Sequence, residues 1–144
     1  METPEATVQL MYELLCGPAD EERDWETFRS LFWPGATFII ARPSPDGEVD
    51  AGQWDVEDFI EAATAEYAEA GFWEREVWSR TDAWGTIAQV WSTYESRYDS
   101  ADGEPAGRGI NAIQLVRFDG NWLITGVVFD IEDMAGPIPE MYGG

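Results

Sequence analysis

A chain of 144 residues with 44% hydrophobic and 14% aromatic residues predicts one domain with ample apolar surface for folding. Its 29 acidic residues against 8 basic ones give a formal charge of −21, which repels nucleic acids and anionic membrane surfaces. Because the sequence lacks histidine and lysine and has one cysteine, Cys16, it excludes histidine or thiolate metal cages, Schiff-base chemistry and an intrachain disulfide. We expect no nucleic-acid or membrane partner, no metal and no cofactor.

The sequence also carries no targeting or membrane-spanning pattern. Its first residues lack a basic region followed by an apolar core, and no apolar run approaches the roughly 18 residues of a membrane span. We therefore expect a cytoplasmic protein.

The first half of the chain predicts three helices. Apolar residues recur at helical spacing before Gly17, after Asp24 and after Asp55, and the two aspartates are plausible N-caps. Proline and glycine interrupt the pattern between these stretches. The expected elements are helices over about 6–16, 25–33 and 56–70, a strand over 36–42, and a turn-rich segment over 43–52 with a brief strand near Val49.

The second half predicts an antiparallel meander. Four stretches rich in β-branched and aromatic residues follow Gly71, and the Asp119-Gly120 pair is typical of a tight hairpin turn. The expected strands cover 72–83, 86–98, 108–118 and 121–131. Helices early and strands late indicate an α+β fold, with helices packed on one face of a strongly curved mixed or antiparallel sheet.

The two hairpins allow the strand register to be predicted. If the Asp119-Gly120 turn pairs Phe118 with Asn121, then Asn111 faces Val128.

The preceding hairpin extends this register to a third strand. If its loop pairs Tyr98 with Arg108, then Glu95 lies opposite Asn111. One face of the sheet then carries both apolar and polar side chains, among them Trp91, Glu95, Asn111, Trp122 and Asp130.

Neither face of this sheet has the composition of a solvated one. The helices can cover only one face, so we expect the other to meet a second copy of the chain in a homodimer.

The inner face is the candidate site, because carboxylates on an apolar face must be paired, hydrogen-bonded or shifted in pKa. One interpretation is structural: Glu95 pairs with Arg97 or Arg108 at the rim of the sheet. The other is a ligand cavity between sheet and helices, with Glu95, Asn111 and Asp130 as polar anchors.

Seven short segments, together with the order of the expected elements, carry a resemblance to a known family. They are Asp24-Trp25, Leu31-Phe32, Pro34-Gly35-Ala36, Ile87-Ala88, Ser92–Glu95, Arg108–Asn111 and Trp122–Ile124. The chain resembles the nuclear transport factor 2-like superfamily, which includes SnoaL-like cyclases, ketosteroid isomerases and scytalone dehydratases. The resemblance implies a cone-shaped, cystatin-like α+β barrel with an inner pocket, often dimeric through the open sheet face. It also implies that residues 1–144 form a single domain, with a core over about 6–132 and a C-terminal extension over 133–144.

Three functions follow from this fold. The first is binding of a small, largely apolar ligand in the pocket. The second is an isomerase, dehydratase or cyclase, in which Asp130 or Glu95 moves a proton and Tyr12 donates a hydrogen bond. The third is a dimeric scaffold whose cavity is filled by its own side chains. The candidate ligand-binding residues are Tyr12, Trp54, Trp91, Glu95, Asn111, Trp122 and Asp130, with Trp54 near the pocket mouth.

Overall fold

The computed structural model describes residues 1–43 and 48–144, so part of the predicted turn over 43–52 lies outside the described residues. The strands are β1 (Phe32–Pro43), β2 (Val49–Asp55), β3 (Trp73–Trp84), β4 (Ile87–Arg97), β5 (Gly107–Phe118) and β6 (Asn121–Ile131). The helices are α1 (Pro4–Leu15), α2 (Trp25–Ser30), α3 (Val56–Tyr67) and α4 (Glu132–Ala135), followed by a 3₁₀ turn at Glu140–Tyr142.

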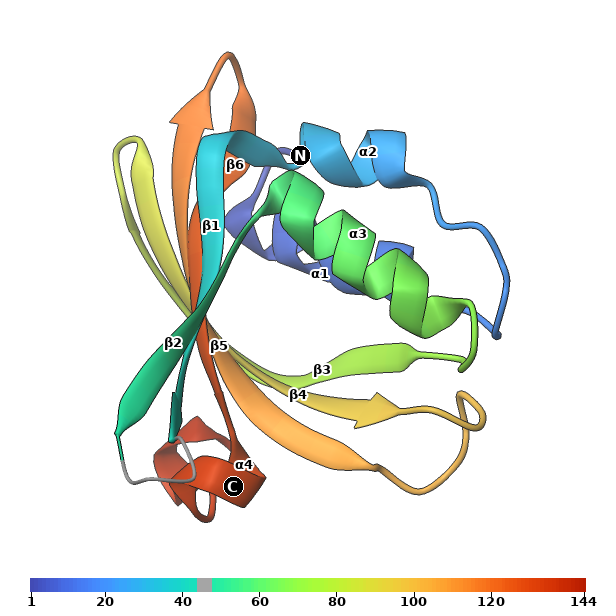
Figure 1. Cartoon of the computed structure of the whole chain (residues 1–144). Helices are drawn as coiled ribbons and strands as arrows, with labels where there is room; N and C mark the ends of the chain where they lie inside the picture. Colours follow the sequence, from blue (N-terminus) through green and yellow to red (C-terminus); the bar gives the residue numbers. More distant parts are fainter. Residues whose placement is uncertain (44–47) are drawn as a thin grey trace.

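The strands form one curved, mixed sheet in the order β2-β1-β6-β5-β4-β3. Strand β1 pairs with β6 in parallel, and every other neighbouring pair is antiparallel. The helices α1, α2 and α3 lie on the concave side of the sheet (Figure 1). The predicted α+β class is confirmed, and the sheet stays open between β2 and β3 instead of closing into a barrel.

Side-chain caps fix the start of each of the first three helices. The Thr3, Asp24 and Asp55 side chains each accept a backbone N–H from the first helical turn. Asp58 returns the bond to the Asp55 N–H and completes a capping box. The helix starts predicted at Asp24 and Asp55 are confirmed.

The strand β1 begins four residues earlier than predicted. Helix α2 ends at Ser30, and the Pro34-Gly35 pair lies inside the strand instead of breaking a helix. Gly35 has a φ of +87°, and the pairing of β1 with β6 is irregular between Phe32 and Thr37. Gly35 therefore lies at an irregularity in the strand pairing and does not end a helix. Glycine suits this position because it tolerates a positive φ.

The hairpin between β5 and β6 has the predicted turn. Asp119 and Gly120 have φ angles of 52° and 78°, and Phe118 pairs with Asn121. A register shift farther along β6 then places Phe129 opposite Asn111, where Val128 was expected. This single extra residue reverses the faces of the end of β6.

The predicted register of β4 on β5 is wrong. Glu95 pairs with Arg108, and Ser92 pairs with Asn111. The prediction paired Tyr98 with Arg108, but the loop is longer and is closed by a hydrogen bond from the Ala106 N–H to a β4 carbonyl. The error is three residues, and an odd shift exchanges the inner and outer faces of β4.

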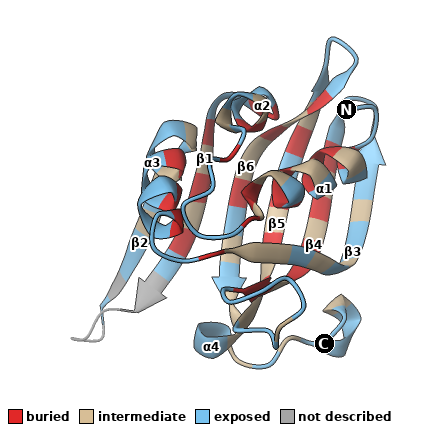
Figure 2. Cartoon of the chain, turned by 90° about the vertical axis from the view of Figure 1, so that its right-hand side faces the viewer, coloured by how far each residue is buried: buried red, intermediate tan, exposed pale blue. Residues whose placement is uncertain are grey.

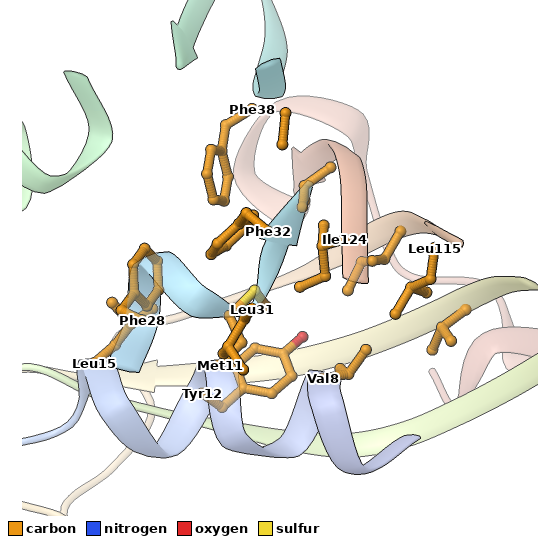
Figure 3. Packing of buried hydrophobic residues seen from close by; sticks show 14 of the residues in the cluster. Val8, Met11, Tyr12, Leu15, Phe28, Leu31, Phe32, Phe38, Leu115 and Ile124 are labelled. Carbon is orange, nitrogen blue, oxygen red and sulfur yellow. The ribbon is translucent and has the colours of Figure 1, made fainter. Parts of the chain in front are cut away.

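The core lies between the concave face of the sheet and the helices (Figure 2). Phe28, Ile113 and Ile124 are fully buried. One face of α1 points toward Phe28 and Ile124 (Figure 3). The α1 residues of this face are Val8, Met11, Tyr12 and Leu15.

The C-terminal segment lies on the convex face of the sheet, which we call the outer face. The Tyr142 ring stacks on Trp91 with a centroid distance of 5.1 Å and meets the edge of Trp78 at 5.8 Å. Thr93 Oγ1 donates a 2.7 Å hydrogen bond to the Tyr142 carbonyl. The segment over 133–144 thus covers part of the face that was expected to form the homodimer, and the homodimer stays a prediction.

Within the described part of the chain, none of the helices has the length and apolar character needed to cross a membrane.

Candidate functional site

A cavity of about 340 Å³ lies between the helices α1 and α3 and the inner face of the sheet. Eight of its sixteen lining residues are aromatic and five are aliphatic, so its walls are mainly apolar. The three remaining lining residues, Glu66, Glu74 and Asn111, are polar. The aromatic ones are Phe38, Trp54, Phe59, Tyr67, Phe72, Tyr94, Tyr98 and Phe129.

Glu74, the second residue of β3, is the unusual group in this wall. Its backbone is held by Cys16, whose Sγ lies 3.4 Å from both the N and the O atom of Glu74. Among the described residues, no hydrogen bond or ion pair joins the Glu74 carboxyl to another side chain. Burial without a compensating cation raises the pKa of this carboxyl from its ordinary 4.5 to about 8.

Three buried tyrosines surround Glu74. Burial raises the pKa of Tyr12, Tyr67 and Tyr94, and the charge of Glu74 raises each of them further. All three hydroxyls therefore stay protonated across the physiological pH range. They are hydrogen-bond donors and cannot act as bases.

Tyr12 belongs to a chain of internal hydrogen bonds. Asn111 Nδ2 donates to the Tyr12 hydroxyl at 2.9 Å, and this hydroxyl lies 2.6 Å from Ser92 Oγ. Because Ser92 Oγ donates its single proton to Glu76 at 2.5 Å, Tyr12 must donate to Ser92. The Tyr12 proton is therefore already used within the protein.

The structure brings part of the predicted site together. Trp54 and Asn111 line the cavity, and Tyr12 lies behind its wall as the hydrogen-bond partner of Asn111. Trp122 is buried in the hydrophobic core and does not line the cavity.

The other predicted site residues, Trp91, Glu95 and Asp130, lie on the outer face, so their predicted placement inside the fold is wrong. Glu95 pairs with Arg97 at 2.9 Å, as the structural interpretation of this residue predicted. Asp130 is exposed and bonds to the N–H of its neighbour Ile131. The register shift of β4 displaced Trp91 and Glu95, and the shift in β6 displaced Asp130.

The sequence does not predict Glu74 as a site residue, because its neighbours in sequence are typical of a strand with a solvated face. Glu74 and Glu76 alternate with Trp73 and Arg75. This pattern gives no reason to place a glutamate on the inner face of the sheet. The one available signal is Phe72, which precedes Glu74 by two residues and lines the same cavity.

A second, larger hollow of about 520 Å³ lies on the outer face of the sheet. Its walls include the exposed Trp84 and Ile87, together with Gln89 and Gln114. It has no counterpart of Glu74, because its one acid, Asp82, pairs with Arg80 at 3.4 Å. We therefore take the inner cavity as the candidate site.

The acids of the fold do not form a metal centre in the described residues. No three cysteine, aspartate or glutamate side chains in 1–43 and 48–144 are grouped as metal ligands.

No family model and no curated protein matches the sequence, whereas solved structures match the fold. A cystatin-like protein of unknown function from Nostoc punctiforme has a TM-score of 0.63 at 14% identity, over 94% of this chain and 98% of that one. Aln2 from a Streptomyces species has a TM-score of 0.62 at 19% identity, over 92% and 94% of the two chains. An NTF2-like protein of unknown function from Silicibacter pomeroyi has a TM-score of 0.57 at 18% identity, over 88% and 91%. The chain therefore has the cystatin-like fold of the NTF2-like proteins.

Proposed function

We propose that this protein binds a small, largely apolar molecule in the inner cavity, with the Glu74 carboxyl contacting the polar group of that molecule. The volume of about 340 Å³ falls within the range of small-molecule sites. Aromatic walls with a few polar groups are also the usual composition of such sites.

The unpartnered Glu74 carboxyl is the observation that carries this proposal. Placing a carboxyl in an apolar wall costs free energy, because it gives up water and gains no partner in return. Groups of this kind concentrate at functional sites, where a ligand supplies the missing partner. A scaffold with a filled cavity would gain nothing from Glu74.

A variant that fills the cavity tests the proposal. Ala62 is exposed on α3 and lines the cavity, so Ala62→Trp is expected to place a large side chain there without disturbing the core. We expect the wild type to bind 2-naphthol with one-to-one stoichiometry, and Ala62→Trp to bind it about tenfold more weakly or worse. Naphthol fluorescence measures both affinities.

Ala65→Trp is the matched control, because Ala65 is exposed on the same helix and does not line the cavity. It should bind 2-naphthol as the wild type does. Equal binding by Ala62→Trp, or no binding by the wild type, would contradict the proposal.

A proton-transfer enzyme is the second candidate, because burial raises the pKa of Glu74 to about 8, near the pH at which an acid or base catalyst works best. Glu74 would then take the role that the sequence analysis gave to Asp130 or Glu95. Tyr12 is not the hydrogen-bond donor, since its proton is committed to Ser92.

Exchange of the α-protons of 2-tetralone in deuterium oxide, followed by NMR, tests this second function. If Glu74 is the base, the wild type accelerates exchange and Glu74→Gln loses about 100-fold or more of the effect. Glu61→Gln, which removes an exposed charge from α3, should retain it. Equal rates in wild type and Glu74→Gln would exclude Glu74 as the base.

A further inference from the structure

We infer that the molecule taken by the cavity is a cation, with a protonated or quaternary amine carried on an apolar body. This inference rests on the proposed function and names the chemical class of its ligand. Three properties of the cavity support it: the sign of its charges, the nature of its walls and the state of Glu74.

All charged groups in the cavity wall are acidic. Glu66 and Glu74 are the only ionisable carboxyls among the lining residues, and no arginine lines the cavity within the described part of the chain. A ligand carboxylate or phosphate would therefore find no counter-charge in the described wall. An ammonium group would instead supply the partner that the Glu74 carboxyl lacks.

Arg23, which lies against the cavity residue Tyr67, is already engaged elsewhere. Arg23 is buried and donates to four backbone carbonyls, those of Leu15, Gly17, Pro18 and Glu21. Its guanidinium also lies 4.4 Å from the centroid of a tyrosine ring, that of Tyr67. These bonds hold the guanidinium among carbonyls, so it does not neutralise Glu74.

The walls beside Glu74 are suited to a cation. Tyr67 stacks on Phe72 at 5.3 Å, and Phe72 meets Tyr98 at 5.8 Å, so three rings of the cavity wall follow one another. Aromatic rings attract cations through their quadrupole, most strongly where water is excluded. The net charge of −21 also draws cations toward the protein and repels anions.

Binding of a cation should be coupled to the ionisation of Glu74. The pKa of the free group is about 8, so it is mostly protonated at neutral pH, and a neighbouring ammonium favours the carboxylate. Binding then releases up to about one proton, and the affinity rises with pH until it levels off above about pH 8. The other titratable or charged groups around Glu74 or in the same cavity wall are Tyr12, Cys16, Arg23, Glu66, Tyr67, Glu76, Tyr94 and Tyr98.

Two probes of the same shape isolate the charge: 4-(trimethylammonio)benzyl alcohol and its neutral analogue 4-tert-butylbenzyl alcohol. Calorimetry on the full chain at neutral pH, in two buffers of different ionisation enthalpy, gives both affinities and the proton count. We expect the cation to bind about tenfold or more tightly than the neutral analogue, with proton release. Glu74→Gln should bind the two probes about equally and release no proton.

The outcomes separate this inference from the proposed function. If the neutral probe binds as well as the cation, or better, the cavity is a ligand site and the inference of a cation is overturned. If Glu74→Gln keeps the full cation preference, the role given to Glu74 is overturned. If neither probe nor 2-naphthol binds, the proposed function fails, and this inference fails with it.

Discussion

Glu74→Gln is expected to raise the free energy of unfolding by about 2 to 4 kcal/mol at about pH 8.5 and to change it little below about pH 4.5. In the folded protein burial raises the pKa of this carboxyl from 4.5 to about 8. Between these values the folded state binds more protons than the unfolded state, so the contribution of Glu74 to stability falls as pH rises. Glutamine does not ionise, so the variant avoids the free-energy cost of the buried carboxylate. Urea denaturation between about pH 4.5 and pH 8.5 measures the difference in the free energy of unfolding.

Glu61→Gln separates this local effect from the overall charge. It removes the same single charge from a protein of net charge −21, but from an exposed position on α3. Its effect on stability should be much smaller and should vary less with pH. If the free energy of unfolding of the two variants depended on pH in the same way, the effect would come from the net charge and not from the burial of Glu74 in the cavity.

Arg23→Met is expected to lower the free energy of unfolding by about 3 to 5 kcal/mol. Methionine retains much of the apolar stem but donates no hydrogen bonds, so the four carbonyls around the guanidinium each lose the hydrogen bond from Arg23. One of these carbonyls belongs to Gly17, which also exchanges two backbone hydrogen bonds with Phe72 in the cavity wall. The variant should therefore also weaken 2-naphthol binding.

Arg29→Met is the matched control for Arg23→Met. Arg29 pairs with Glu57 at 2.6 Å, but both side chains are largely exposed, with 48% and 65% of their surfaces accessible. Solvent screens such a pair, so its loss should cost far less than the loss of Arg23. Equal losses in the two variants would show that the buried guanidinium does not organise the connection between α1 and α2. Denaturation midpoints and slopes for both proteins decide the question.

Local patterns predicted most of the fold. The capping residues Asp24 and Asp55 and the turn residues Asp119 and Gly120 act within a few residues of themselves, so the sequence identifies them without tertiary information. The start of β1 was the exception, because a Pro-Gly pair marks equally a helix end and a strand irregularity.

The candidate site was predicted less well, because it depends on strand register over long distances. A three-residue error in the pairing of β4 exchanged its faces and put Trp91 and Glu95 inside. An extra residue in β6 did the same to Asp130. Trp54 and Asn111 were placed correctly, whereas Glu74 stands in a strand whose alternation looks solvated.

The position of 2-naphthol in a crystal of its complex would decide whether the inner cavity is the binding site. We expect the ring between α3 and the inner face of the sheet, with its hydroxyl within hydrogen-bonding distance of the Glu74 carboxyl. A naphthol ring in the hollow beside Trp84 and Ile87, with the inner cavity left without it, would contradict the proposed function.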